Sequence, residues 1–233
     1  MRRTLLLVSL YALAPAYGLP YSKSRTCPLM GKLLELAASK EGIVLDIGAN
    51  GGCEMSSALR SGRRVVGVEC LASAYEELLS AEHISANPNA TLLHVCAGSR
   101  IQMGELYLAR DSSSLIEFNV AKGLELRKVP KTGSRRESVV IVPVDSLLSP
   151  NERVAVIKVD VQGVEYDVLK GLMQTVARDL PVIGYEDSNV FRKSGEVRDL
   201  LAPLGYACHQ RWGDRVCSPN AVANTSSSAK TPR

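Results

Sequence analysis

The sequence predicts an α/β fold with a mainly parallel sheet and helices on both of its faces. Short apolar runs that lack helical periodicity alternate with segments that have it. Near the start of this alternation, a glycine-rich turn directly follows an apolar strand. The chain has 233 residues, 45% of them hydrophobic, which suits one well-buried core and is too few for two large domains.

The first elements lead to the glycine-rich turn. A helix is expected at Leu29 to Ser39, and Gly42 separates it from the first strand, Ile43 to Ile47. The turn that follows reads Gly48-Ala49-Asn50-Gly51-Gly52, and a ligand can approach its backbone closely because glycine has no Cβ. A helix expected at Glu54 to Leu59 directs its N-terminal N–H groups to the same place. We therefore expect a polar cofactor over this turn.

The spacing of the turn indicates which cofactor. The dinucleotide fingerprint requires G-x-G-x-x-G, but Asn50 occupies its second glycine position. A second strand, Val65 to Val68, ends at Glu69, which lies 69 − 46 = 23 residues after Asp46. An acid that binds ribose hydroxyls is expected roughly 20 residues on. S-adenosylmethionine has a ribose and no pyrophosphate, so we expect Asp46 beside its amino-acid end and Glu69 on its ribose. An ordinary tight turn is the alternative.

The remaining elements continue the alternation of strands and helices. The chain is expected to close with a hairpin between Cys208 and Cys217 that turns at Trp212-Gly213-Asp214. The elements expected before it are a helix at Ala72 to Ser80, a strand at Thr91 to Cys96, extended pieces at Glu105 to Ala109 and Val139 to Val142, a fourth strand at Val154 to Asp160, a helix at Val164 to Val176, a fifth strand at Pro181 to Tyr185 and a helix at Glu196 to Leu204.

The fourth strand begins the second informative segment, I-K-V-D-V-Q-G-V-E-Y-D-V-L-K-G, from Ile157 to Gly171. Together with V-L-D-I-G-A-N-G-G and V-V-G-V-E, it resembles the FkbM family of S-adenosylmethionine-dependent methyltransferases, over roughly Leu29 to Gly205. The resemblance implies a Rossmann-like class I methyltransferase fold, with a mainly parallel seven-stranded sheet whose last strand is antiparallel. It also implies O-methylation of a sugar or a small metabolite.

Candidate catalytic residues follow from this strand. Asp160 ends it near the expected cofactor, so it is placed to meet the methyl acceptor as a general base. Lys158, on the same strand face, would hold Asp160 ionised if the two pair. Glu165 opens the next helix, where the helix dipole favours a carboxylate with or without a chemical role. Glu186 and Asp187 end the fifth strand and are weaker candidates for the acceptor pocket.

The expected cofactor contacts are Asp46, Gly48, Ala49, Asn50, Gly51, Glu69, Cys96 and Ala97. Two residues depart from the FkbM pattern: Gln162 replaces the acid that usually precedes the glycine, and Cys70 replaces the commoner Pro after Glu69. An amide cannot act as a base at neutral pH, so Gln162 leaves open a catalytically silent binding module. An NAD(P)-dependent oxidoreductase is a further alternative. No metal site is expected, because the spacing of the acids matches no metal motif.

Net charge and the distribution of basic residues indicate which classes of partner the protein can bind. The net charge of +4 falls to 4 − 2 = +2 without Arg2 and Arg3, which gives no support to a nucleic-acid binder. The resemblance to the FkbM family implies a small-molecule or glycan acceptor as the partner. A basic insertion, Lys122 to Arg136, is either a solvated loop or a surface that steers an anionic acceptor. The nucleophile elbow G-x-S-x-G of Ser-His-Asp hydrolases does not occur in the sequence.

The N-terminus predicts entry into the secretory pathway. Arg2 and Arg3 precede the apolar run Leu5 to Ala14, and small residues flank Tyr17 at the positions that a signal peptidase reads. This run of ten residues is shorter than the roughly 20 apolar residues that span a bilayer. We expect a signal peptide at residues 1–18, an FkbM-type methyltransferase domain at 19–219 and a disordered tail at 220–233. An uncleaved anchor and an organelle-targeting sequence are the alternatives.

Six cysteines and three histidines complete the candidates. Cys208 and Cys217 are placed to form a disulfide across the closing hairpin. Cys70 and Cys96 are expected to be free, buried and apolar. No C-x-x-C pair indicates structural zinc. His94, in the third strand, is expected in the core rather than as a base.

Overall fold

The computed structural model describes residues 27–108, 113–115, 136–187, 194–211 and 213–220. Several sequence predictions lie outside these ranges: the signal peptide at residues 1–18, the basic insertion apart from Arg136, and the tail beyond residue 220. Within the described ranges, no helix has both the length and the apolar character needed to cross a bilayer.

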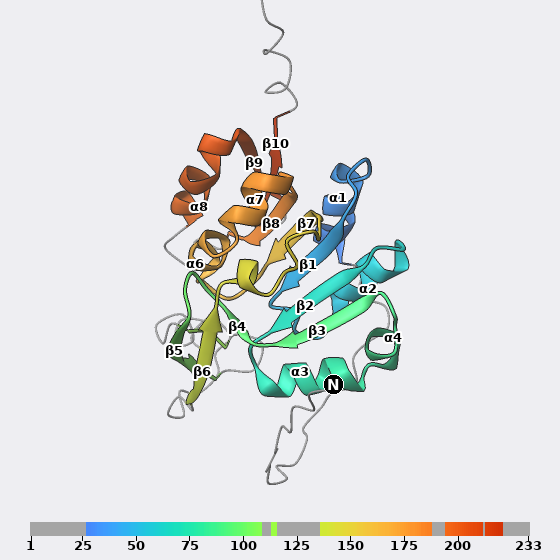
Figure 1. Cartoon of the computed structure of the whole chain (residues 1–233), viewed down its shortest axis with the longest axis vertical. Helices are drawn as coiled ribbons and strands as arrows, with labels where there is room; N and C mark the ends of the chain where they lie inside the picture. The colour runs from blue at the N-terminus through green and yellow to red at the C-terminus, as the bar shows by residue number, and fades with distance from the viewer. Residues whose placement is uncertain (1–26, 109–112, 116–135, 188–193, 212, 221–233) are drawn as a thin grey trace, which may run out of the picture.

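A seven-stranded sheet forms the centre of the molecule (Figure 1). Its strands are β1 (Ile43–Ile47), β2 (Val65–Glu69), β3 (Ala90–His94), β7 (Val154–Val159), β8 (Val182–Glu186), β9 (Tyr206–Arg211) and β10 (Asp214–Pro219). The order across the sheet is β3-β2-β1-β7-β8-β10-β9. All pairs from β3 to β8 are parallel, whereas β10 is antiparallel to both of its neighbours. The predicted mainly parallel sheet and its antiparallel C-terminal hairpin are confirmed.

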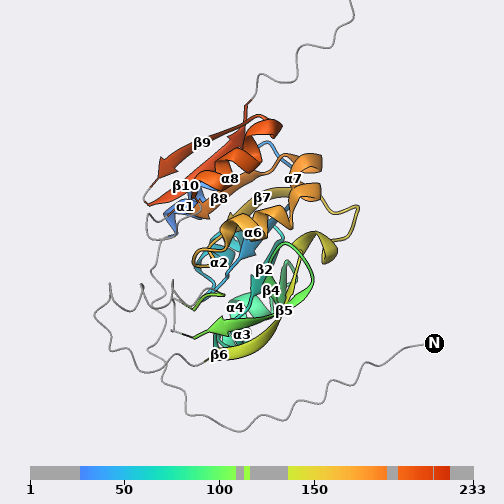
Figure 2. The same cartoon turned by 90° about the vertical axis from the view of Figure 1, so that its left-hand side faces the viewer.

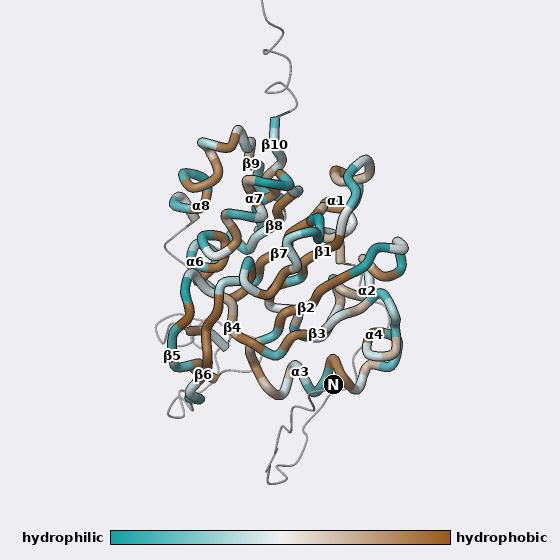
Figure 3. Tube along the Cα trace, in the orientation of Figure 1, coloured by the Kyte–Doolittle hydropathy of each residue, from teal (hydrophilic) through white to brown (hydrophobic). Residues whose placement is uncertain are grey.

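Helices cover both faces of this sheet, as the view in Figure 2 shows. One face packs against α1 (Pro28–Leu36), α2 (Cys53–Arg60), α3 (Ala72–Ser80) and α4 (Glu82–Ser85). The other packs against α6 (Glu165–Lys170), α7 (Met173–Asp179) and α8 (Ser194–Leu201). Two 3-10 turns are η2 (Val144–Ser146) and η3 (Ala202–Leu204). Because both faces are covered, β1 and β7 are buried along their whole length and are largely apolar (Figure 3).

A second, three-stranded sheet lies beside the carboxyl end of β2. It consists of β4 (Cys96–Ala97), β5 (Gln102–Tyr107) and β6 (Arg136–Val142), in the order β4-β6-β5. The prediction of a single strand from Thr91 to Cys96 is therefore wrong at its C-terminal end. Pairing with β2 in the large sheet stops at His94, and Cys96 pairs with β6 in the small sheet. His94 is exposed rather than in the core, since it ends an edge strand, and its ring stacks on Tyr75 with centroids 4.6 Å apart.

The expected single helix Val164 to Val176 is divided into α6 and α7 at Gly171. A Cβ on Gly171 would collide with the carbonyl oxygen of Gly98, so the backbone of this junction lies directly against the start of the small sheet. That contact joins residues far apart in sequence, and helical periodicity does not reveal it.

Three disulfides link the six cysteines. The bond between Cys208 and Cys217, which are register partners on β9 and β10, confirms the predicted pair. The expectation that Cys70 and Cys96 are free is wrong, because β4 brings them together with their Cα atoms 4.3 Å apart. The third bond ties Cys27 to Cys53, at the starts of α1 and α2.

Candidate active site

A pocket of about 290 Å³ opens at the carboxyl ends of β1, β2 and β7, where ligands bind in open α/β sheets. Its volume is close to the lower end of the roughly 300–1,000 Å³ typical of small-molecule sites. Apolar walls come from the ends of the strands and from the small sheet. Polar groups come from the glycine-rich turn and from the segment after β7. The wall includes Val68, Leu71, Val95, Ala97, Leu106, Asn50, Glu69, Asp160 and Gln162.

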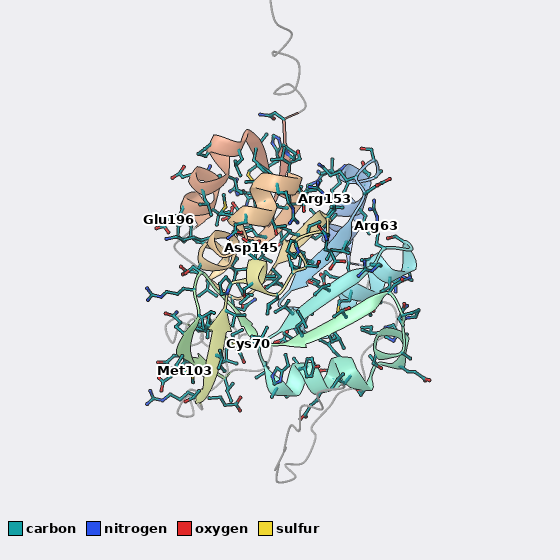
Figure 4. All side chains as sticks on the ribbon, in the orientation of Figure 1. Arg63, Cys70, Met103, Asp145, Arg153 and Glu196 are labelled. Atoms are coloured by element: carbon teal, nitrogen blue, oxygen red, sulfur yellow. A yellow bond between two sulfur atoms is a disulfide. The ribbon has the colours of Figure 1, made fainter. Side chains whose placement is uncertain are left out.

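A wider hollow of about 660 Å³ lies at the opposite, amino ends of the strands. Arg63 and Arg153, both labelled in Figure 4, border it together with Arg64. Their guanidinium groups are held by the protein: Arg63 donates to the carbonyl oxygens of Lys40 and Ala37, and Arg64 and Arg153 form ion pairs. The carboxyl-end pocket is therefore the better candidate site.

Glu69 is fixed at the wall of this pocket by the backbone. Its Oε2 accepts a hydrogen bond from the N–H of Asn50 at 2.8 Å, and its Oε1 accepts one from the N–H of Leu71 at 2.7 Å. The side chain thus joins the turn after β1 to the turn after β2. Each carboxylate oxygen can accept further bonds. A buried acid with spare acceptor capacity, beside apolar walls, suits the two hydroxyls of a ribose and the adjoining base.

Behind the turn, Asp46 and Lys158 are register partners on β1 and β7. Lys158 Nζ lies 3.5 Å from Asp46 Oδ1 and 3.5 Å from Asp160 Oδ2, and donates to the carbonyl oxygen of Gly48 at 3.3 Å. Burial raises the pKa of Asp46, and the Lys158 charge opposes that rise. For Lys158, burial lowers the pKa, but the charges of Asp46 and Asp160 outweigh it and leave the pKa raised. The ammonium is therefore charged and lies between the carboxyl groups of Asp46 and Asp160.

Gln162 links Asp160, in the pocket wall, to Glu186, which does not line the pocket. Its Nε2 donates to Asp160 Oδ1 and to Glu186 Oε2, each at 2.9 Å. Burial and the charge of Asp160 raise the pKa of Glu186 well above its usual range. Asp214, opposite Glu186 on β10, also has its pKa raised, to about 6, by burial and by Asp160. Gln162, which replaces the acid usual in the FkbM pattern, thus places an uncharged amide that donates two hydrogen bonds between carboxyl groups that would otherwise repel one another.

Glu165 supports the loop that carries Gln162. Its Oε1 accepts hydrogen bonds from the N–H groups of Val161 at 3.2 Å and Gly163 at 3.0 Å. Burial raises its pKa to about 7, while these backbone bonds oppose the rise. The side chain is 6% exposed and does not line the pocket. Its contacts are those of a residue that shapes the start of α6.

The structure divides the residues expected from the sequence between the pocket wall and the layer behind it. In the wall are Gly48, Asn50, Glu69, Cys96, Ala97 and Asp160. Outside the wall are Asp46, Ala49, Gly51, Lys158 and Glu165. Sequence reasoning missed Leu106 and Ser114, which reach the wall through the small sheet. The hydroxyl of Ser114 donates to the carbonyl oxygen of Gln162 at 2.8 Å, and nothing in the sequence around Ser114 indicates this contact.

The described residues provide little for a metal ion. Within them, the group of ligand side chains close enough to share an ion comprises Cys27, Cys53 and Glu54, and both cysteines are in a disulfide.

Two solved methyltransferase structures resemble this chain. Methyltransferase FkbM from Methylobacillus flagellatus KT is similar over 76% of this chain and 43% of its own, with 15% identity and a TM-score of 0.53. This chain therefore spans less than half the length of that protein. Magnesium protoporphyrin IX methyltransferase from Synechocystis PCC 6803 has 10% identity and a TM-score of 0.44, covering 83% of this chain and 77% of its own. A search of curated proteins finds no match.

The sheet order and the pocket at its carboxyl end are those of a Rossmann-like class I methyltransferase fold. The sequence pattern described as the methyltransferase FkbM domain matches residues 46–216, from the aspartate of the glycine-rich segment to β10. That match covers most of the described chain, and the protein belongs to the FkbM methyltransferase family.

Proposed function

We propose that this methyltransferase binds S-adenosylmethionine in the carboxyl-end pocket and methylates a hydroxyl group of a sugar or another small metabolite. The observation that carries the proposal is Glu69, whose carboxylate is fixed by two backbone N–H groups in a pocket that Asp160 also borders. A nucleoside site and a candidate base therefore share one cavity.

The residues of the pocket fit the proposed cofactor. Glu69 would accept hydrogen bonds from the ribose hydroxyls, and Leu71 and Ala97 would pack against the base. The bound cofactor supplies an electrophilic methyl group. Lys158 lies behind the glycine-rich turn. Its positive charge offsets part of the negative charge that Asp46 and Asp160 bring to this end of the sheet.

Asp160 is the candidate for the proton of the acceptor hydroxyl. Gln162 fixes Asp160 Oδ1, and Lys158 lies near Oδ2, so both neighbours hold the carboxyl group in one orientation. A carboxylate held in this orientation can accept the proton as the acceptor oxygen is methylated.

Calorimetric titration with S-adenosylhomocysteine tests cofactor binding. We expect Glu69→Gln to weaken binding by about tenfold or more, since hydrogen bonds to a charged acceptor contribute about 1.5–3 kcal/mol. Asp145→Asn is the matched control. Asp145 also accepts two backbone N–H groups, from Gln174 at 2.9 Å and Thr175 at 3.1 Å, but it does not line the pocket. Folded wild-type protein that fails to bind would refute the proposal.

Transfer of a radiolabelled methyl group from S-adenosylmethionine to a panel of sugars and hydroxylated metabolites tests the reaction. We expect Asp160→Asn to abolish transfer while retaining affinity for S-adenosylhomocysteine. Binding without any transfer would favour a silent binding module. Binding of NAD or NADP instead of S-adenosylhomocysteine would favour an oxidoreductase.

We further propose that the protein enters the secretory pathway. The basic and apolar N-terminus supports this route, and so do the three disulfides, because such bonds persist in oxidising compartments.

A further inference from the structure

One of the three disulfides lies in the wall of the proposed cofactor pocket. It joins Cys70, which directly follows β2, to Cys96, the first residue of β4, and both cysteines line the pocket. Figure 4 labels Cys70 where the large sheet meets the small one. Cys96 is buried, whereas Cys70 is partly exposed.

The bond constrains the groups that would contact the nucleoside. Cys70 lies between Glu69 and Leu71, and the N–H of Leu71 holds Glu69 Oε1. On the other side, Cys96 precedes Ala97 in the opposite part of the wall. A hydrogen bond of 3.0 Å from the N–H of Val95 to the carbonyl oxygen of Glu69 is a further link between these two walls. The disulfide therefore ties the carboxylate wall covalently to the β4 wall.

The other two disulfides are not part of the pocket wall. Cys27–Cys53 and Cys208–Cys217 contribute no residue to its wall. Cys27–Cys53 has a sequence separation of 26 residues, the same as Cys70–Cys96, so the two bonds close loops of equal length. Loop closure sets much of a disulfide's effect on the unfolded chain, so the two bonds should have comparable effects through that state.

We propose that the Cys70–Cys96 disulfide is a positioning element of the cofactor site. It holds the carboxylate wall and the β4 wall together, so that affinity for S-adenosylmethionine depends on whether these two cysteines are oxidised. This inference rests on the proposed function. In a reducing medium, a dithiol would transfer two electrons and two protons to the bond. The protein would gain two thiols, the reductant would become a disulfide, and the two walls could separate.

The experiment compares S-adenosylhomocysteine binding by the oxidised wild type and two double variants. We expect Cys70→Ser/Cys96→Ser to bind at least about tenfold more weakly than wild type, and Cys27→Ser/Cys53→Ser to bind within about twofold. Equal affinity in both variants would overturn the inference and leave the proposed function intact. Failure of the oxidised wild type to bind would instead refute the proposed function.

Circular dichroism and thermal unfolding separate loss of affinity from loss of fold. If the serine variant does not fold, Cys70→Ala/Cys96→Val provides an apolar replacement. If neither pocket variant folds where the control does, the bond serves the fold as a whole and the inference is wrong.

Stepwise reduction of the wild type gives a second measurement. We expect affinity to fall as Cys70 and Cys96 become available to a thiol-alkylating reagent, identified by mass spectrometry. A fall that follows only the alkylation of Cys27 and Cys53 would contradict the proposal.

Discussion

The carbonyl oxygen of Asp160 occupies the space into which a side chain on Gly48 would project. Gly48 has φ of 79° and directly follows β1, while Asp160 directly follows β7. The two backbones touch, which places the candidate base beside the turn. Glycine at this position was expected to let a ligand approach, but in the structure another part of the protein fills that space.

This contact predicts that two glycine-to-alanine substitutions lower the free energy of unfolding by different amounts. Gly62 has φ of 80°, almost the same as Gly48, but nothing lies within 4 Å of its added Cβ. We expect Gly62→Ala to lower the free energy of unfolding by about 1–2 kcal/mol, from backbone strain alone. Gly48→Ala adds a collision with backbone and should cost more than about 3 kcal/mol. Urea unfolding measures both, and equal losses would show that the contact is unimportant.

Removing the cation behind the pocket should destabilise the fold. Lys158→Met leaves the fully buried Asp46 without its partner, and we expect the free energy of unfolding to fall by about 3–5 kcal/mol at pH 7. The double variant Asp46→Asn/Lys158→Met removes both charges and should recover much of that loss. Urea unfolding of the single and double variants checks this, and equal stabilities would argue against an unpaired charge as the cause.

Glu165 should make stability fall as the pH rises. Burial raises its folded-state pKa to about 7, above the ordinary 4.5, so its stabilising contribution is complete below pH 4.5 and lost as the pH passes 7. Glu165→Gln can keep both backbone hydrogen bonds on its carbonyl oxygen without the charge. We expect the variant to match wild type at pH 4 and to exceed it by about 3 kcal/mol at pH 8. Chemical unfolding at both pH values measures the difference, and a constant difference would contradict the assignment.

Methyl transfer by the same variant distinguishes two roles for this residue. If Glu165 only shapes the start of α6, Glu165→Gln retains transfer. Abolished transfer in a stable variant would identify a chemical role.

Gln162→Glu should be costly at high pH. It replaces the shared donor with a third carboxylate beside Asp160 and Glu186. Mutual repulsion raises the pKa values of neighbouring carboxyl groups, and the folded state is less destabilised when some of them are protonated. We expect the free energy of unfolding to fall by about 2–3 kcal/mol at pH 8 and by less at pH 5. Gln210→Glu, on the exposed end of β9, changes charge equally and should cost under about 0.5 kcal/mol. Similar losses at both positions would refute the bridging role.

The N-terminal prediction has a direct measurement. We expect the full chain, expressed in secreting eukaryotic cells, to be recovered from the medium with Leu19 as its first residue, as determined by intact mass. Leu7→Arg interrupts the apolar run and should keep the protein inside the cell with Met1 or Arg2 at its start. Recovery of an intracellular wild-type chain that retains residues 1–18 would contradict the prediction.

The sequence was sufficient where local pattern and burial agree. β1 and β7 are continuous apolar runs, because helices cover both faces, and such runs are recognisable without knowledge of their neighbours. Glu69 could be predicted to lie at the pocket, because in nucleotide-binding folds an acid at the end of the second strand follows the first strand at a near-constant spacing. Asp160 could be identified for a related reason, since the end of a central strand lies at the ligand-binding edge.

Features that depend on contacts between distant residues could not be predicted. β4 has two residues and no pattern of its own, so its pairing with β6 and the Cys70–Cys96 bond follow only from the folded chain. The break at Gly171 arises from contact with Gly98, 73 residues earlier (171 − 98). Gln162 could be recognised as a departure from the FkbM pattern, but its two carboxylate partners could not, because Glu186 lies on another strand.

The position of β10 has a consequence for biosynthesis. β10 lies between β8 and β9 in the sheet, yet it is the last strand of the described chain to be made. While the polypeptide emerges from the ribosome, β8 and β9 are present before the strand that must separate them. Until residues 214–219 arrive, one edge of β8 has unpaired backbone groups and can bind a foreign strand or another nascent chain. The sheet can therefore close only after residue 219 has been synthesised, which leaves a period in which the growing protein depends on protection from aggregation.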